Sequence, residues 1–458
     1  MMCKAVFKLN LFCGAFLLGI GLFFAGCKKD QVESPLPPQP NPKVFELPPT
    51  SRVVMYEVNL RAFSQDGSFA GLEARLPDLE RLQVNVIWLM PIHPVGQVRS
   101  AGGLGSPYSV RDYRGIAQEY GNLADFKRLV QAAHQKGMAV ILDWVANHTA
   151  WDHPWIDAHP DWYTRDGSGT IVHPPGTNWL DVADLNFDKQ EMRQAMIADM
   201  RYWTEEVGID GFRCDAADMV PYTFWLQAID SLRRGAPQTL LMFAEGIRSN
   251  HVNAGFDLIF SWNYYTQLKN SFQQGNGTAN LWQAHLAEYN QMPTHAHRLR
   301  FITNHDEYAW DNTPAALFGG DAAAFAAFAL SSCWSPVIMI YNGQEIGWPQ
   351  LIPFFTKAPL NWNYKAAYRA QYENWMALRA ARPLLFEGEM NLLQTASLTA
   401  FSRAHEQDTL LVVVNTRAQA DSLQLPAHWQ DNRWTSLFGS ADEPHRSAGH
   451  AVNVWKRN

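Results

Sequence analysis

The stretch GFRCDAAD, residues 211–218, places Arg213 and Asp215 two positions apart, directly after an apolar run. Side chains alternate along a strand, so residues two positions apart share a face. A buried ion pair is weak evidence for stability, so this pair needs another explanation. Charged groups held inside a protein are common where protons are transferred or where charge develops during a reaction.

Other polar side chains close three further apolar runs. They are Asp143, Asn147 and His148 in AVILDWVANH (139–148), Glu245 in LLMFAEG (240–246), and Asn304, His305 and Asp306 in RFITNHD (300–306). Any one of these motifs is more often a helix cap or an exposed strand end than a site. Four of them in order, each at the carboxyl end of an expected strand, favour one shared site.

Eight short runs rich in β-branched and aromatic residues are expected to be the buried parallel strands that position these side chains. They are residues 53–60, 84–91, 139–148, 209–217, 240–246, 256–263, 300–306 and 335–343. Helical patterns lie between most of them, and those at 122–137 and 188–208 end at a glycine. Eight alternating units predict a (β/α)8 TIM barrel of the α/β class, whose active sites lie at the carboxyl ends of the strands. A doubly wound open sheet is the alternative, but no Gly-rich phosphate fingerprint follows the first run.

The remaining segments divide the chain further. We expect the barrel over residues 52–382, with a small subdomain inserted after the third strand at about 149–187, because loops of this length are usually functional. After Arg382 the helical period disappears and short alternating runs predict a C-terminal antiparallel β domain, a β-sandwich over 383–458.

The N-terminal residues indicate export. Two lysines precede an apolar stretch that ends at Ala25-Gly26-Cys27, a pattern similar to a bacterial lipoprotein signal peptide over 1–26 with lipidation of Cys27. Phe24 stands where such signals prefer leucine, and a plain membrane anchor is the alternative. A Pro-rich tether would follow over 27–51. This predicts an exported protein held at the outer membrane by its lipid, facing either the periplasm or the cell surface.

The composition excludes some partners. The net charge is -7, and 18% of the 458 residues are charged against 47% hydrophobic. No Lys/Arg run indicates a nucleic-acid partner. Past the signal and Cys27, only Cys214 and Cys333 remain, either as buried free thiols or as a disulfide. The sequence carries no indication of oligomeric state.

The four motifs DWVANH, GFRCDAA, FAEG and TNHD resemble, in order and spacing, the signature regions of the α-amylase family of glycoside hydrolases. VADLN (182–186) is similar to a fifth region, and GSPYSVRDY (105–113) to the segment that lines the family's cleft. The resemblance covers about residues 52–382. It implies that Asp215 is the nucleophile, Glu245 the general acid and base, and Asp306 the residue that stabilises the transition state.

The same resemblance implies roles for the surrounding side chains. Substrate would be bound by Tyr108, His148, Arg213 and His305, with Asp143 as an electrostatic support. Arg213 should lower the pKa of Asp215 and keep it ionised. Glu245 has no cation near it in the sequence and is expected to stay protonated more easily. Four tryptophans of the insertion, Trp151, Trp155, Trp162 and Trp179, are candidates for extending the sugar-binding surface.

Two further expectations concern a metal and the substrate. Asn147 and Asp184 match positions that hold a structural calcium ion in many family members, and both supply oxygen ligands. Asp218 stands where many amylases carry a substrate-binding lysine, which puts the subsites for the leaving group in doubt.

The function implied is retaining hydrolysis of α-1,4-glucosidic bonds in starch, maltooligosaccharides or related α-glucans. A 4-α-glucanotransferase, which hands the glycosyl group to a sugar hydroxyl, shares the first half-reaction and is the alternative. An inactive carbohydrate-binding lipoprotein is the remote alternative, disfavoured because Asp215, Glu245 and Asp306 are all present.

Overall fold

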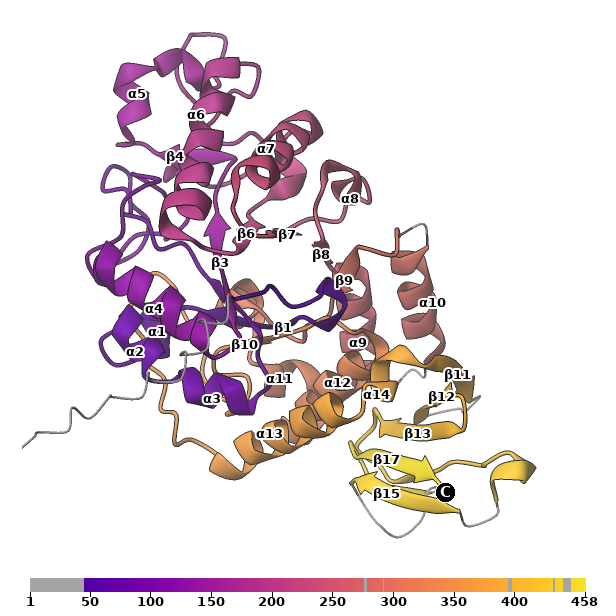
Figure 1. The fold of residues 1–458 in the computed structure, drawn as a ribbon. Coiled ribbons are helices and arrows are strands. Elements are labelled where there is room, and N and C mark those ends of the chain that lie inside the picture. Colours follow the sequence, from indigo (N-terminus) through magenta and orange to yellow (C-terminus); the bar gives the residue numbers. More distant parts are fainter. Residues whose placement is uncertain (1–44, 276–277, 291, 394–397, 431–432, 440–445) are drawn as a thin grey trace, which may run out of the picture. The chain divides into compact units, whose positions relative to one another are not determined.

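The structure is a computed structural model. Eight short parallel strands form the centre of the protein and pair in the order β10-β1-β2-β3-β6-β7-β8-β9 (Figure 1). Their bounds are β1 (Val54–Val58), β2 (Val86–Leu89), β3 (Ala139–Trp144), β6 (Gly211–Cys214), β7 (Leu241–Ala244), β8 (Leu258–Phe260), β9 (His297–Leu299) and β10 (Ile338–Tyr341). All their residues are buried except His297, as expected for strands covered on both faces. The predicted (β/α)8 barrel is confirmed.

The barrel is nearly closed, and its seventh strand departs from the prediction. β1 pairs with β10 along four residues, whereas β9 meets β10 only through a bridge between Arg300 and Ile338. The expected strand at 300–306 was misplaced: β9 ends at Leu299, and the following residues continue without ladder partners until a helical turn begins at His305. The buried Arg298 and Arg300 interrupt the apolar pattern, which hid the strand.

Helices connect the strands around the barrel (Figure 1). The longer ones are α4 (Leu123–Gln135), α6 (Gln190–Arg201), α7 (Tyr222–Gly235), α9 (Trp262–Gln274), α10 (Thr278–Tyr289), α12 (Asp321–Trp334) and α13 (Ala366–Ala381). Shorter ones are α1 (Leu60–Phe63), α2 (Phe69–Glu73), α3 (Leu76–Arg81), α8 (His251–Ala254), α11 (Pro314–Phe318) and α14 (Leu384–Glu387). Their ends follow the sequence: Asn122 and Asp125 form a capping box on α4, and Gly208 ends the helical segment after α6 with a φ of 84°.

One glycine sets the spacing of the two strands that carry the site. Gly211 opens β6 with a φ of 145°, and a Cβ there would lie 1.9 Å from the carbonyl oxygen of Leu241 on β7. Only glycine permits this approach. β6 and β7 are therefore held close at the amino end, in register from Gly211 to Cys214.

The insertion after β3 contains a two-stranded antiparallel ladder. β4 (His148–Ala150) pairs with β5 (Val182–Asp184), which places His148 opposite Asp184. α5 (Pro154–Ala158) and a 3-10 turn at Pro160–Trp162 lie between these strands.

A five-stranded antiparallel sheet follows the barrel, in the order β11-β12-β13-β17-β15. Its strands are β11 (Glu389–Leu393), β12 (Leu398–His405), β13 (Asp408–Asn415), β15 (Trp434–Phe438) and β17 (Val452–Arg457), with a two-stranded ladder of β14 (Asp421–Ser422) and β16 (Arg446–Ser447). One face packs into the main core, where Phe401 contacts Trp334 of the largely buried α12. The other face packs against Leu423 and Trp429.

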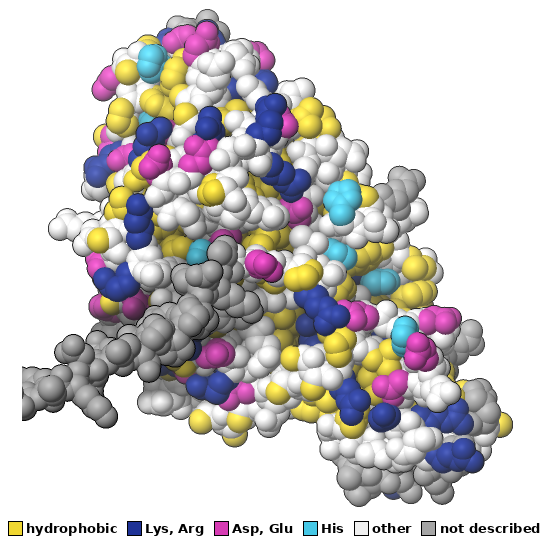
Figure 2. Space-filling view, in the orientation of Figure 1, with side chains coloured by type: hydrophobic (Ala, Val, Ile, Leu, Met, Phe, Trp, Pro, Cys, Tyr) yellow, Lys and Arg dark blue, Asp and Glu magenta, His cyan; other side chains and the backbone are white. Residues whose placement is uncertain are grey.

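The structure describes residues 45–458 except 276–277, 291, 394–397, 431–432 and 440–445. The expected signal peptide (1–26), Cys27 and most of the tether (27–51) lie outside this range. Among the described residues no helix has both the length and the apolar character needed to cross a membrane. Cys214 and Cys333 are buried free thiols. On the face drawn in Figure 2, basic and acidic side chains are mixed rather than gathered by sign.

Candidate active site

One buried guanidinium holds three carboxylates at the carboxyl ends of the strands. Arg213 Nη1 lies 2.7 Å from Asp143 Oδ1 and 3.0 Å from Asp215 Oδ1, and Nη2 lies 2.8 Å from Glu245 Oε1. Arg213 and Asp143 are fully buried. Glu245 has no cation near it in the sequence, but the fold supplies one. The barrel brings β6 and β7 together, so a residue 32 positions away becomes its partner.

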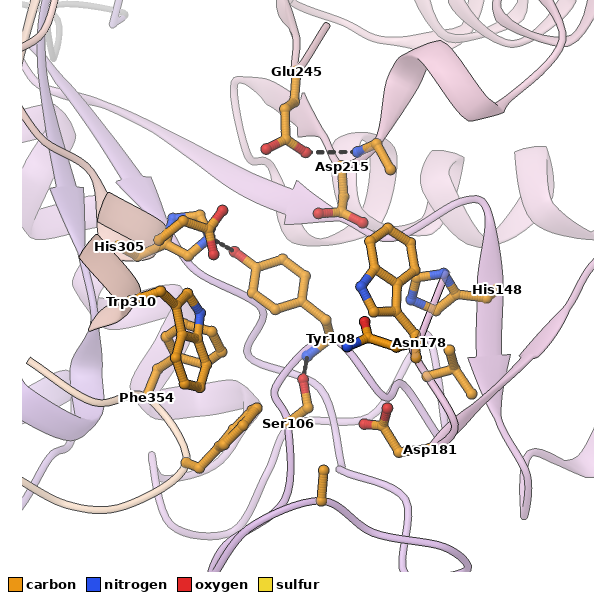
Figure 3. Close-up of a pocket in the computed structure, with 16 residues that line it drawn as sticks. Ser106, Tyr108, His148, Asn178, Asp181, Asp215, Glu245, His305, Trp310 and Phe354 are labelled. Carbon is orange, nitrogen blue, oxygen red and sulfur yellow. Dashed lines mark hydrogen bonds and ion pairs between the residues drawn. The ribbon is translucent and has the colours of Figure 1, made fainter. Parts of the chain in front are cut away.

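Backbone contacts also join the two loops that carry Asp215 and Glu245. The Ala216 N–H donates to Glu245 Oε2 at 2.7 Å (dashed in Figure 3), and the Ala217 N–H donates to the Glu245 carbonyl at 2.9 Å. Ala216 makes its contact from a left-handed conformation with a φ of 42°. The positions of the two carboxylates are thus coupled through one peptide unit as well as through Arg213.

This cluster contains one guanidinium and three carboxyl groups, so the acids outnumber the cation. Burial and the neighbouring Glu245 carboxylate raise the pKa of Asp215 well above its usual range, although Arg213 acts to lower it. Burial likewise raises the pKa of Asp143. Arg213 acts to lower the pKa of Asp215, as expected, but it does not keep that pKa low, because burial and the Glu245 carboxylate outweigh it. The cluster therefore favours retaining a proton, which these neighbouring acids share as a group.

A second group of contacts surrounds His305. Its Nε2 lies 2.7 Å from the Tyr108 hydroxyl and 3.4 Å from Asp306 Oδ2, and its Nδ1 lies 2.5 Å from Glu57 Oε1. The Tyr108 ring stacks on the imidazole with centroids 5.3 Å apart. Although burial acts to lower it, Asp306 and Glu57 raise the pKa of His305 to about 9.

These side chains line a cavity of about 500 Å³ at the mouth of the barrel. Asp215 and Glu245 lie on one side of Tyr108 in Figure 3, with His148 beside Asp215 and His305 across the ring. Burial lowers the pKa of His148 to about 4, so this imidazole is neutral near pH 7. All of Tyr108, His148, Asp215, Glu245, His305 and Asp306 contribute to this one cavity.

Aromatic side chains form the outer walls of the cavity, and sequence reasoning missed most of them. Trp310, in the helical segment Glu307–Asp311 after β9, and Phe354 and Phe355, in the loop after β10, contact one another with centroids 4.9–5.6 Å apart. Of the four tryptophans proposed from the insertion, only Trp179 lines the cavity. Trp310 is 63% exposed and Trp179 is 38% exposed, so both rings are available to a ligand.

The other tryptophans of the insertion have different partners. Trp155 and Trp162 pack against each other with centroids 5.1 Å apart, and the Arg99 guanidinium covers the Trp151 ring at 3.8 Å. They support the insertion rather than line the cavity.

Asp218 is bound within the protein. Its carboxylate lies 3.1 Å from Arg248 Nε and 2.7 Å from His251 Nε2, and it accepts the Ile247 N–H at 2.9 Å. It therefore ties the loop after β6 to the loop after β7, directly beside Glu245. The lysine that many amylases carry at this position could not make these contacts.

The two expected calcium ligands lie next to the same ladder. Asn147 precedes β4 and Asp184 ends β5. Burial raises the pKa of the Asp184 carboxyl, and among the described residues no Lys or Arg forms an ion pair with it. A buried carboxylate that forms no ion pair with Lys or Arg is compatible with a bound cation, although no group of three or more His, Cys, Asp or Glu gathers in the described part of the chain.

Comparison with known proteins agrees with this geometry. Residues 40–173 match the model of the α-amylase catalytic domain, and residues 391–449 match that of the maltogenic amylase C-terminal domain. A crystal structure of an α-amylase from Lactobacillus plantarum has a TM-score of 0.79 and 27% identity, covering 89% of this chain and 99% of that one.

Two curated relatives extend the comparison. The α-amylase MalA of Haloarcula japonica is 28% identical over 82% of this chain and 57% of its own length. The α-1,4-glucan:maltose-1-phosphate maltosyltransferase of Rhodospirillum rubrum is 28% identical over 75% of this chain and 54% of its own. The chain thus spans little more than half of either relative. With the barrel, the C-terminal sheet and the carboxylates at the barrel mouth, these matches make the chain similar to the α-amylase family of glycoside hydrolases.

Proposed function

We propose that the protein hydrolyses α-1,4-glucosidic bonds in maltooligosaccharides and related α-glucans with retention of configuration. The observation that carries the proposal is the shared guanidinium, which holds Asp215 and Glu245 side by side at the cavity. Retaining glycosidases need two close carboxyl groups, one as nucleophile and one as acid and base. Asp306, 43% exposed across the cavity beside His305, is available to a developing positive charge.

In the first step an Asp215 oxygen bonds to the anomeric carbon while the bond from that carbon to the leaving oxygen breaks. The Glu245 proton passes to the leaving oxygen. In the second step Glu245 takes a proton from water, the water oxygen bonds to the anomeric carbon, and the bond to Asp215 breaks. Tyr108, His148 and His305 are placed to bind the sugar, and the Asp143–Arg213 pair orients the two reacting carboxyls.

Transfer to a sugar hydroxyl is the second candidate. The relative from Rhodospirillum rubrum is named as a maltosyltransferase, and the exposed Trp310 and Trp179 offer surfaces on which an acceptor sugar could stack. The first half-reaction is the same in both candidates. Only the acceptor in the second step distinguishes them.

A product time course on maltoheptaose tests both candidates. If the protein is a hydrolase, a protein of residues 28–458 should convert maltoheptaose only to shorter maltooligosaccharides. An Asp215→Asn variant should form no product. Early appearance of longer oligomers would establish transfer instead. Binding of the sugar without turnover in the unmodified protein would favour an inactive carbohydrate-binding protein and overturn the proposal.

We also propose a structural calcium ion bound by Asn147 and Asp184. Calcium takes carboxylate and amide oxygens, and the remaining ligands would be backbone carbonyls or water. EDTA is expected to lower the melting temperature, and added calcium to restore it. An Asp184→Asn variant should lose this response. A melting temperature of the unmodified protein that does not change with EDTA would contradict calcium binding.

We further propose that the protein is exported and anchored at the outer membrane through a lipid on Cys27. The support is the sequence pattern alone, since this segment lies outside the described residues. Metabolic labelling with a fatty-acid analogue in a bacterial host should mark the protein, and a Cys27→Ser variant should be unlabelled. Equal labelling of the two would exclude acylation of Cys27.

A further inference from the structure

Glu57 is a buried acid that the proposed mechanism does not use. It lies on β1, with no exposed surface, and its Oε1 is 2.5 Å from His305 Nδ1 and 3.4 Å from the His305 backbone N. Its Oε2 is buried and has no hydrogen-bond partner among the described residues. Burying a carboxylate in this way is unfavourable unless a charged partner compensates it.

The contacts of the Tyr108 hydroxyl indicate the protonation of that partner, His305. The Tyr108 hydroxyl lies 3.0 Å from Asp143 Oδ2 and 2.7 Å from His305 Nε2. It has a single hydrogen to donate. If that hydrogen goes to the Asp143 carboxylate, His305 Nε2 must itself carry a hydrogen and donate it to the tyrosine oxygen.

His305 Nδ1 faces a carboxylate at the same time. A distance of 2.5 Å to Glu57 Oε1 requires a proton between the two atoms. With the Tyr108 hydrogen on Asp143, Nε2 therefore carries a hydrogen, and Nδ1 carries one or shares it with Glu57. Nε2, which faces the cavity, remains a donor whichever of the Glu57 and His305 atoms holds the second proton.

We propose that Glu57 is a positioning residue for His305: it holds the imidazole by Nδ1 and keeps Nε2 protonated, so that its hydrogen, directed at the Tyr108 oxygen in this structure, is available to a sugar hydroxyl that enters the cavity. This inference deepens the proposed function and rests on it for the identity of the ligand. Glu57 does not touch the cavity and acts only through His305.

Titratable and charged groups face His305 from every side. These groups are Glu57, Tyr108, Asp143, Arg213 and Asp306, on the strands and loops packed against the His305 imidazole. Uncharged neighbours are the rings of Trp88 and Phe354, in edge contact at 5.8 and 5.7 Å. Glu57 and Asp306 favour the charged imidazole, whereas Arg213 opposes it and burial disfavours it. Replacing Glu57 by glutamine leaves the shape and removes one of the two favourable charges.

The deciding measurement is the titration of the His305 ring by 15N NMR in the full exported chain, assigned with a His305→Gln variant. The unmodified ring should titrate near the pKa of about 9. In Glu57→Gln the midpoint should fall toward the ordinary histidine value of about 6.5. An unchanged midpoint would overturn the proposal, and this assay needs no substrate.

A second assay reads the consequence for binding. Maltotetraose affinity is measured from pH 5.5 to 8.5 in a Glu245→Gln background, which prevents turnover. Adding Glu57→Gln should leave affinity close to the parent at pH 5.5 and weaken it about tenfold or more at pH 8.5, because Nε2 then loses its hydrogen. Equal weakening at all pH values would mean a merely structural role. A parent that binds no maltotetraose would instead contradict the proposed function, and the NMR result would still decide the role of Glu57.

Two further variants distinguish a specific effect on His305 from a general loss of folding. Glu345→Gln is the matched control, since Glu345 is also buried and bonded, to the Tyr56 hydroxyl at 2.6 Å; it should leave the His305 titration unchanged. If Glu57→Gln does not fold, Glu57→Asp is measured in both assays. Retracting the carboxylate by one methylene should lower the midpoint partway, and no shift would overturn the proposal.

Discussion

Arg213 is a single side chain that organises three acids. Its planar fork reaches Asp143, Asp215 and Glu245 together, with distances of 2.7–3.0 Å. A lysine carries the same charge but cannot present two fixed donor edges. The arrangement therefore depends on guanidinium geometry rather than on charge alone.

Replacing Arg213 by lysine is expected to damage both stability and catalysis. Breaking a buried charge network costs about 3–5 kcal/mol of unfolding free energy, and misplacing the two carboxyls should lower kcat about 100-fold or more. The variant's melting temperature and its kcat on maltoheptaose check this. Arg128→Lys is the control, because Arg128 forms a surface pair with Glu73 and should change neither quantity. An Arg213→Lys enzyme with normal kcat would show that charge is sufficient.

At the scale of elements, the loops after β6 and β7 behave as one unit. Asp218 on the first loop binds Arg248, His251 and the Ile247 N–H on the second. A Cβ on Gly246, the residue after Glu245, would lie 2.4 Å from Asp218 Oδ1. The loop that carries the proposed acid is thus packed directly on Asp218.

Asp218→Asn should loosen the loop that holds Glu245 and thereby impair protonation of the leaving group. We expect kcat on maltoheptaose to fall about tenfold. Activity on a maltoside with a dinitrophenyl leaving group, which departs without a proton, should change little. Asp230→Asn, at an exposed pair with Arg234, is the control and should alter neither substrate. An equal loss on both substrates would indicate general disorder of the site instead.

The same elements explain what the sequence could and could not predict. Strand ends identify Asp143, Asp215 and Glu245 because barrel topology brings consecutive carboxyl ends together. Glu57 was not predicted as a site residue because it lies within an apolar run, where the pattern indicates only the interior of a strand. Trp310 and Phe354 escaped because nothing in a long loop indicates which rings face a cavity. The cation beside Glu245 depends on a side-chain reach across two strands, which spacing along the chain does not encode.

For the molecule as a whole, buried histidines predict sensitivity to acid. Burial lowers the pKa of His93, His148 and His153 to about 4 and that of His285 to about 3. In the unfolded chain these groups titrate near 6.5. The unfolded state therefore binds protons first as the pH falls, so the contribution of these four histidines to stability is complete above about pH 6.5 and declines toward pH 4.

Melting temperatures at pH 7.5, 6, 5 and 4 measure this effect. A His93→Gln variant removes one contributor, since His93 is enclosed by Tyr113, Trp144 and Trp203. Its melting temperature should decline less steeply with acid than that of the unmodified protein. His405→Gln, at an exposed position, should decline in parallel with it. Identical slopes for all three proteins would exclude His93 as a source of acid sensitivity.

The left-handed Ala216 has a consequence for how this active site can evolve. A non-glycine residue at a φ of 42° is disfavoured by about 1 kcal/mol or more, yet it directs the peptide N–H that holds Glu245. Because that peptide follows Asp215 immediately, a mutation that reshapes this turn displaces both carboxyls together. One substitution in this turn therefore changes the spacing of Asp215 and Glu245, whereas a substitution in the aromatic rim changes only one wall of the cavity.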